Sequence, residues 1–371
     1  MEPKDAFLVL NLLSGIGPIR VRRMLEYFER PDRVLEASAK ELQEVPGIGR
    51  EMAQQIRSWE KTVDLDGEKQ RMAERGIETL TLDDDDYPPA LREIHDPPFL
   101  LYIKGKLLPA DSAAIGVVGS RRMTHYGREQ TRKLSFQLAR TGFCIISGLA
   151  RGIDTAAHEA ALAAEGRTIA VLGSGIGNVY PPENQALADM ISKNGAVISE
   201  FPVLYVPDKQ SFPLRNRIVS GMSQGLLVVE APARSGSMIT ANQALEQGRT
   251  VFAVPGPIDR ANSEGCHRLI RAGATLVCSA RDIIDDLGAE LNSLALDFSA
   301  PVKTSELKRP MPDLNENEEK ILQYLENGES TIDALAEALE IPAGVVSATL
   351  LQLEMKSLIK QLPGKYFTKL I

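Results

Sequence analysis

The segment AIGVVGSRR, residues 114–122, joins an apolar run to a polar turn and indicates the class of fold. Its first six residues carry no charge, which is typical of a parallel strand covered on both faces of a sheet. Similar runs recur downstream, and stretches with helical spacing separate several of them. The sequence therefore predicts an α/β, doubly wound, extended Rossmann-like core whose ligand lies at the carboxyl ends of the strands. The predicted strands are 77–82, 99–105, 114–119, 143–148, 168–173, 196–199, 225–231 and 250–256.

The turn after this strand, Gly119-Ser120-Arg121-Arg122, differs from a nucleotide-binding turn. A dinucleotide-binding fold carries G-x-G-x-x-G, and a P-loop carries G-x-x-x-x-G-K-[ST]. The later motif Gly173-x-Gly175-x-Gly177 matches neither spacing. We therefore expect no nucleotide cofactor.

The composition excludes several other classes of protein. Three cysteines form no C-x-x-C pair, and no apolar run approaches about 18 residues, so we expect a cytoplasmic protein without disulfides or a membrane span. Asp154 and His158 are spaced as a helix-cap pair or as a fragment of a metal site, and we expect no metal because no third ligand accompanies them.

Charge is distributed unevenly along the chain. The net charge is −8, but residues 120–151 contain seven arginines and lysines against one acid, Glu129. Screening limits the reach of a charge to about 10 Å, so a local basic patch can bind phosphates on an acidic protein. The net charge therefore does not exclude a polyanionic ligand.

Residues 1–75 contain two similar segments, 13–28 and 45–59, each with Gly-Ile-Gly before a helical pattern. This repeat is the signature of a helix-hairpin-helix (SAM-like) domain, in which glycines form a tight turn and the next helix begins with free N–H groups. Arginines follow both copies. The motif either contacts DNA phosphates or simply joins two packed helices.

Residues 290–314 have the composition of a linker. Residues 315–371 have the succession of three helical patterns and a hairpin that is typical of a winged helix. Its helices are predicted at 316–326, after Thr331-Ile332 and after Ile341-Pro342, with a wing hairpin at 357–369. The third helix has one basic residue, Lys356, although base readout requires Arg, Lys, Asn or Gln. We expect a protein-contact module or an accessory contact through the wing lysines 360, 365 and 369 rather than a duplex-DNA repressor.

Several loops of the core are expected to meet at one edge of the sheet and to bind phosphates and bases. Their small residues and helix starts suit oxyanions, and arginine suits phosphates. Phe212 is either a core residue or a stacking surface for a base, and Arg217 either binds DNA or pairs with Glu200 or Glu230. Arg215 and Asn216 could instead brace the loop or a dimer. The predicted DNA-binding residues are Gly119, Ser120, Arg121, Arg151, Lys209, Phe212, Arg215, Asn216, Arg217, Ser235, Gly236 and Ser237.

Seven sequence blocks, in order, resemble those of the bacterial DNA-processing protein A (DprA/Smf) family. They are VVGSRRMTHYG, ISGLARGIDTAAH, AVLGSGIGNVYPPEN, ISEFP, FPLRNRIVSGMS, VVEAPARSGSMITANQAL and VPGPI. The resemblance implies a non-enzymatic protein that binds and protects single-stranded DNA and helps to load the RecA recombinase during natural transformation. It also implies a homodimer formed through the core, with single-strand-binding protein as a further partner.

The resemblance assigns the strand-binding pocket to Gly119, Ser120 and Arg121, together with Lys209 and Phe212. Arg215, Asn216 and Arg217 match the family's R-N-R sequence, either shaping the pocket or contacting DNA.

A different class of function remains open. The glycine-rich loops also resemble those of Rossmann-like nucleotide phosphoribohydrolases, which attack a glycosidic bond with an acidic residue near such a loop. Glu230 and Glu200 are the candidates for that role. Arg151 and the helical end domains are unexpected in such an enzyme.

Overall fold

The computed structural model describes residues 1–291, 314–325, 328–356, 358–362 and 365–369. The chain divides into two compact units, Met1–Val302 and Lys303–Ile371. The predicted linker, 290–314, lies almost entirely outside the described residues.

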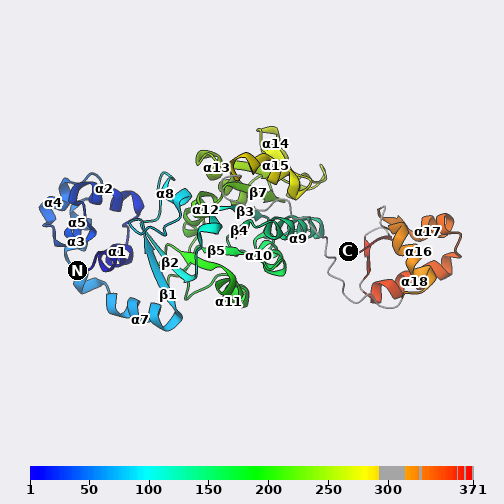
Figure 1. Ribbon diagram of the computed structural model, residues 1–371, viewed down its shortest axis with the longest axis horizontal. Helices are drawn as coiled ribbons and strands as arrows, with labels where there is room; N and C mark the ends of the chain where they lie inside the picture. Colours follow the sequence, from blue (N-terminus) through cyan, green and yellow to red (C-terminus); the bar gives the residue numbers. More distant parts are fainter. Residues whose placement is uncertain (292–313, 326–327, 357, 363–364, 370–371) are drawn as a thin grey trace. The chain divides into compact units, whose positions relative to one another are not determined.

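The first unit begins with a helical domain (Figure 1). Its hairpin turns place Gly15 and Gly47 at positive φ, 77° and 89°, a backbone conformation that glycine adopts without strain. Ile16 and Ile48, the central residues of the two Gly-Ile-Gly motifs, are buried in the domain core. The helices are α1 (Pro3–Leu12), α2 (Pro18–Phe28), α3 (Pro31–Glu36), α4 (Ala39–Glu44), α5 (Arg50–Arg57), α6 (Trp59–Thr62) and α7 (Leu65–Arg75).

The arginines that follow the first turn bind backbone within this unit. Arg20 donates to the carbonyl oxygens of Gly15 and Gly47, at 2.6 and 3.3 Å, and Arg23 donates to that of Pro46 at 3.1 Å. They therefore link the two hairpin turns, as expected if the repeat joins packed helices.

A nine-stranded sheet forms the centre of the first unit, in the order β1-β2-β6-β5-β4-β3-β7-β8-β9. The seven strands from β6 to β9 are parallel, as predicted, but β2 pairs antiparallel with both β1 and β6. The prediction of parallel strands was wrong for this edge, where β1 follows α7 and has exposed and half-buried residues at Glu78, Thr79 and Leu80. The strands are β1 (Ile77–Thr81), β2 (Leu100–Gly105), β3 (Ala114–Gly119), β4 (Cys144–Ser147), β5 (Thr168–Leu172), β6 (Ala196–Ser199), β7 (Gly225–Val229), β8 (Thr250–Ala253) and β9 (Thr275–Leu276).

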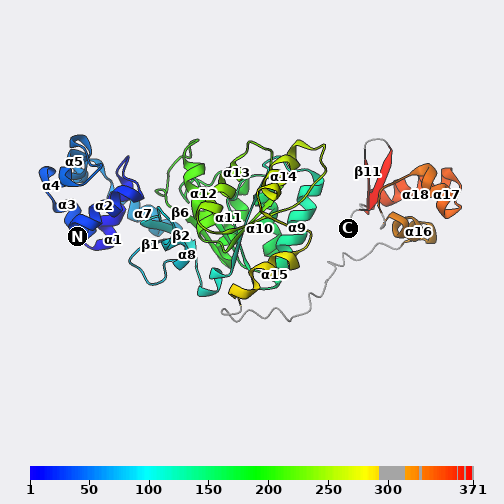
Figure 2. The same cartoon turned by 90° about the horizontal axis from the view of Figure 1, so that it is seen from above.

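Helices cover both faces of this sheet (Figures 1 and 2). One face packs against α9 (His125–Arg140), α10 (Ile153–Ala163), α11 (Gln185–Asn194) and α15 (Ala280–Leu291). The other face packs against α8 (Pro89–Arg92), α12 (Ser211–Gly221), α13 (Gly236–Glu246) and α14 (Glu264–Arg271). Short 3₁₀ helices occupy Pro109–Ser112 (η1), Pro182–Asn184 (η2) and Ala261–Ser263 (η3).

The strand order reverses direction at β3. The chain moves from β3 through β4 and β5 to β6, then returns to the other side of β3 as β7. Loops after the two strands at such a reversal diverge, and ligands of doubly wound sheets bind there. Gly119, which ends β3, and Glu230, which follows β7, therefore mark the predicted ligand-binding position.

The second unit has the order expected of a winged helix. Thr331 caps α17 by accepting a hydrogen bond from Ala334 N at 3.3 Å, and Pro342 precedes α18, as predicted. Its elements are α16 (Glu316–Tyr324), β10 (Ser330–Thr331), α17 (Ile332–Leu339), α18 (Ala343–Met355), β11 (Ile359–Leu362) and β12 (Tyr366–Lys369). Residues 326, 357, 363 and 364 of the predicted first helix and wing lie outside the described residues.

The exposed residues of α18 are mostly apolar, with Ser347 and Gln352 as the polar ones. Val345, Leu351 and Met355 are 40%, 60% and 80% exposed. Lys356, the basic residue at its end, holds the buried carboxylate of Glu318 at 2.7 Å. The described part of this helix therefore presents no free cation to DNA.

Among the described residues, no single helix is long and apolar enough to cross a membrane, although the bent pair α17–α18 satisfies that test by length and composition.

Candidate nucleic-acid interface

The turn after β3 is held by backbone hydrogen bonds at the point where the strand order reverses. Ser120 N donates to Glu230 O at 2.7 Å, and Ser120 O accepts from Ile153 N at 3.2 Å. Gly152, at φ 82°, allows this approach, because a Cβ there would lie 2.3 Å from Ser120 O. The buried Ser120 amide is thus not free for a phosphate, and its hydroxyl accepts from Arg122 N at 3.1 Å.

The Arg121 side chain, in contrast, is exposed and lies over an aromatic ring. Its Cζ is 5.1 Å from the ring centre of Phe212, which is half-buried in the first turn of α12. Gly173, at the end of β5, makes room for that ring, since a Cβ would lie 2.9 Å from Phe212 Cδ1. Lys209, one turn earlier, is exposed and has no ion pair within residues 1–291. The structure thus brings Arg121 and Phe212 together, and Lys209 precedes Phe212 by three residues in the chain.

A second cation–aromatic pair adjoins the first. Arg151 lies over Tyr180, with 5.9 Å between Cζ and the ring centre, and pairs with Glu183. The ring centres of Tyr180 and Phe212 are 5.8 Å apart. Tyr180 was not among the predicted site residues, although its place at the end of a glycine-rich turn was an available signal.

The glycine-rich turn itself does not form an anion site. Gly175 N and Gly177 N donate to the carbonyl oxygens of Tyr205 and Val203, at 3.0 and 2.8 Å. A Cβ on Gly175 would lie 2.2 Å from Val203 O, so the glycine permits close backbone packing. The amides of Gly175 and Gly177 are therefore not free for an anion, because the segment after β6 accepts their hydrogen bonds.

Arg215 lies inside the protein, 4% exposed. Its Nη1 donates to the carbonyl oxygens of Val171 and Gly148, the latter at 2.5 Å, and its Nε donates to the Asn216 side chain at 3.3 Å. Burial lowers the pKa of Arg215 to about 10, opposed by the charge of Asp154. Arg215 therefore links α12 to the ends of β4 and β5, with Asn216 as its side-chain partner, and the assignment of both residues to DNA binding stays a prediction.

Arg217 faces away from Arg215. It is 4% exposed and pairs with Glu200, one of the two carboxylates suggested from the sequence, and with Asp96 at 3.1 Å. Burial raises the pKa of Glu200, and the charge of Arg217 opposes that shift. This ion-pair cluster contributes structure rather than an accessible cation.

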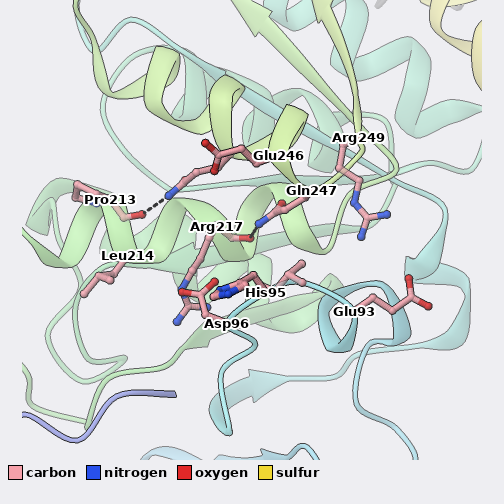
Figure 3. A pocket seen from close by; sticks show the side chains of 11 residues that line it. Glu93, His95, Asp96, Pro213, Leu214, Arg217, Glu246, Gln247 and Arg249 are labelled. Carbon is pink, nitrogen blue, oxygen red and sulfur yellow. Dashed lines mark hydrogen bonds and ion pairs between the residues drawn. The ribbon is translucent and has the colours of Figure 1, made fainter. Parts of the chain in front are cut away.

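A cavity of about 520 Å³ lies beside this cluster (Figure 3). Arg217 points toward Asp96 in its floor, and the exposed carboxylates of Glu93 and Glu246 stand at its rim. Three carboxylates (Glu93, Asp96 and Glu246) and two guanidinium groups (Arg217 and Arg249) line it, and Arg217 is already paired with Asp96, so the lining offers a phosphate no excess of positive charge.

The serines predicted at the start of α13 bind each other. Ser235 Oγ and Ser237 Oγ are 2.8 Å apart, and Gly236 between them is exposed. Within residues 1–291, no hydrogen bond or ring contact joins them to Arg121 or Phe212. Their assignment to DNA binding stays a prediction.

The carboxylates proposed for a hydrolase are already engaged. Glu230 Oε2 accepts from Thr124 N at 2.8 Å, and its Oε1 accepts from the Thr124 hydroxyl. Glu200 is paired with Arg217. Both carboxylates are therefore held by partners inside the protein.

Asp154 and His158 have separate structural roles. Asp154 accepts from Gly148 N and Ala150 N, which closes the turn between β4 and α10. His158 is fully buried and its Nδ1 lies 2.7 Å from Thr168 Oγ1. Among the described residues, no group of three or more His, Cys, Asp or Glu is placed to hold a metal.

Three family models match the chain. DNA recombination-mediator protein A matches residues 78–288, a SAM-like helix-hairpin-helix tandem matches residues 7–58, and the DprA winged helix domain matches residues 305–365. The first match alone covers more than half of the chain.

Curated relatives and solved structures agree with these matches. The chain is 36% identical to Protein Smf of Synechocystis over 98% of both chains, and 45% identical to DNA processing protein DprA of Bacillus subtilis over 58% of this chain and 72% of that one. The X-ray structure of DprA from Streptococcus pneumoniae aligns with a TM-score of 0.69 at 37% identity, covering 77% of this chain and 99% of that one.

A structure of DNA processing protein A from Helicobacter pylori, described by its single-stranded DNA binding mode, aligns with a TM-score of 0.52 at 30% identity. It covers 58% of this chain and 96% of that one. The family models thus match the helix-hairpin-helix, core and winged-helix parts in sequence, and the two solved structures share the fold of the part of the chain that they cover. The chain belongs to the DNA recombination-mediator protein A family, whose curated members carry the names Smf and DprA.

Proposed function

We propose that this protein is a non-enzymatic recombination mediator that binds single-stranded DNA at the carboxyl edge of its sheet. The observation that carries the proposal is the exposed Arg121 guanidinium, 5.1 Å from the Phe212 ring centre and without a carboxylate partner within residues 1–291. A free guanidinium binds phosphate, and an aromatic face accepts an unpaired base. The single-stranded DNA binding named for the Helicobacter pylori relative supports this assignment.

Duplex DNA would fit this surface poorly because its bases are stacked inside the helix and cannot reach Phe212. Lys209, three residues before Phe212 in the chain, adds a second cation that has no ion pair within residues 1–291. The same strand would therefore be bound through phosphates and through bases turned outward. The Ser235–Ser237 turn remains a proposed additional contact.

We further propose that two copies join through the core, so that one strand meets two sites and its affinity rises through effective concentration. In the cytoplasm, this dimer would protect an incoming strand and help RecA replace single-strand-binding protein during natural transformation. This part rests on the family to which the chain belongs.

Fluorescence anisotropy with a labelled oligo-dT and a blunt duplex tests strand preference. We expect salt-sensitive binding to oligo-dT, since phosphate contacts release counterions, and much weaker binding to the duplex. Arg121→Ala should weaken binding by about 1–3 kcal/mol. Arg122→Ala is the matched control, because its exposed side chain lies on no ring. Equal affinity for both DNAs would contradict the proposal.

The mediator role needs a separate assay. RecA hydrolyses ATP once it polymerises on a strand, and a coat of single-strand-binding protein delays that step. Adding the full chain should shorten the delay, and Arg121→Ala should shorten it less. An unchanged delay would mean that the protein binds single strands but lacks the mediator activity.

A further inference from the structure

Four side chains, from three loops and the first turn of α12, form a continuous series at the carboxyl edge of the sheet. Arg121 lies over Phe212, Phe212 adjoins Tyr180, and Tyr180 lies under Arg151, with successive separations of 5.1, 5.8 and 5.9 Å. The two guanidinium groups thus lie at the ends of the series, and the two aromatic rings lie between them. The series extends the Arg121–Phe212 site by a second ring and a second guanidinium.

The two rings are not stacked on each other. Their planes meet at 51°, whereas Phe201 and Tyr205 of the same protein are stacked at 13° with centres 4.5 Å apart. Tyr180 is also 38% exposed. A tilted, exposed ring offers surface to a flat ligand that a stacked pair would already have covered.

The loop that carries Tyr180 is held in place beside the loop that carries Arg151. Asn184 Nδ2 donates to Leu149 O at 2.8 Å and to Thr155 Oγ1 at 2.9 Å. Asn184 is buried, and it follows Tyr180 by four residues. The ring is therefore positioned before any ligand arrives, which lowers the cost of ordering it on binding.

The guanidinium at the far end of the series is occupied by a carboxylate. Arg151 Nη2 donates to Glu183 Oε2 at 3.0 Å, and its Nε donates to the other oxygen. This two-point geometry is the one that arginine also offers to a phosphate. Both side chains are about half exposed, 50% and 52%, and exposed ion pairs are weak enough to be exchanged.

The charge of Glu183 sets the cost of such an exchange. Its hydrogen bond with Arg151 is the main cause of a lowered pKa, so the carboxylate is ionised at neutral pH. It competes with a phosphate for Arg151, and once Arg151 changes partner the bare carboxylate repels that phosphate. Glu183 thus occupies the position on Arg151 that a phosphate would take, at the end of the aromatic surface.

We propose that Tyr180 is a second stacking platform for a nucleobase beside Phe212, and that Glu183 holds Arg151 until a DNA phosphate displaces it. The inference rests on the proposed function and deepens it, because it assigns two bases and a regulated phosphate contact to this edge. The ligand class is a single strand with at least two unstacked neighbouring bases.

The platform is tested with oligo-dT that contains 2-aminopurine, whose fluorescence falls when the base stacks on an aromatic ring. Tyr180→Leu should weaken binding about 5- to 50-fold and restore part of the fluorescence. Tyr180→Phe should keep both the affinity and the quenching, because it retains the ring.

The exchange is tested by removing the carboxylate. Glu183→Gln should tighten binding about 2- to 5-fold at low salt and steepen the salt dependence, since Arg151 no longer leaves a bare carboxylate behind. Glu129→Gln is the matched control, because it releases Arg132 from an exposed ion pair of 3.6 Å on α9.

The outcomes separate the two levels of proposal. Failure of the unaltered chain to bind oligo-dT would refute the proposed function itself. Normal binding with unchanged affinity and quenching in Tyr180→Leu would overturn the second platform alone. Glu183→Gln binding no more tightly than Glu129→Gln would overturn the exchange.

Discussion

Arg215 donates a 2.5 Å hydrogen bond to the carbonyl oxygen of Gly148, which ties α12 to the carboxyl end of β4. Phe212 stands one turn earlier on the same helix, and Arg121 lies over it. The buried arginine thus holds the aromatic ring at the surface, and the exposed arginine is left free for a ligand. Residues of the same chemical type have opposite roles because of where the fold places them.

Arg215→Ala should therefore lower the free energy of unfolding by about 2–4 kcal/mol, because it leaves buried carbonyls and Asp154 without their partner. Arg215→Lys should recover little, since lysine lacks the planar fork. Urea unfolding followed by circular dichroism measures both. The control is Arg121→Ala, for which a change within about 0.5 kcal/mol is expected. Equal stability of the three variants would contradict the bracing role.

Gly173→Ala should weaken binding of single-stranded DNA without altering any charge. A Cβ at this position would lie 2.9 Å from Phe212 Cδ1 and push the ring from its place. Anisotropy with labelled oligo-dT measures the loss. Gly288→Ala, where a Cβ meets no atom within 4 Å, provides a matched control. An affinity equal to that of the control would show that the ring's position does not matter.

The stability of the protein should fall as pH drops below about 6.5, in part because of His158. Burial, reinforced by the charge of Arg215, lowers the pKa of His158 from 6.5 to about 3. Between pH 6.5 and about 3, His158 is therefore protonated in the unfolded chain but not in the folded one. Its contribution to the free energy of unfolding is complete above pH 6.5 and is lost as pH falls through this range. The loss at pH 5 is about 2 kcal/mol, at 1.36 kcal/mol per pH unit.

Urea midpoints of the native chain and of His158→Gln, measured at pH 7 and pH 5, isolate this contribution because the other titrating groups are common to both. The variant should show the smaller decrease. A decrease of the same size in both proteins would mean that His158 is protonated without cost.

Selection from randomised duplexes by the full chain should return no sequence motif. The exposed residues of α18 are mostly apolar, such as Val345, Leu351 and Met355, and Gln352 is its one exposed residue among the Arg, Lys, Asn and Gln that read base edges. Sequencing of the retained duplexes provides the measurement. A motif that disappears in Leu351→Ala would show that the winged helix reads DNA after all.

Much of the fold could be predicted from local patterns. Continuous apolar runs predicted the parallel strands, and the Gly-Ile-Gly repeats predicted two tight turns, which the structure places at Gly15 and Gly47. The helix predicted after Thr331-Ile332 begins there, and the Thr331 hydroxyl accepts a hydrogen bond from the amide of Ala334 in its first turn. The antiparallel pairing of β1 and β2 was missed, since the direction of a strand depends on its connections rather than on its own residues.

The sequence by itself determined the order of the elements, the basic stretch before α10 and the scarcity of cations on α18, because each of these is a property of neighbouring residues. The tertiary structure decided which groups are accessible. Arg215 and Arg217 are buried and bind groups inside the protein. The amides of Gly175 and Gly177 donate to the segment after β6. Tyr180 lies beside Phe212, which is distant from it in the chain. Hydrogen-bond partners and burial depend on how segments far apart in sequence pack, and no local pattern encodes that.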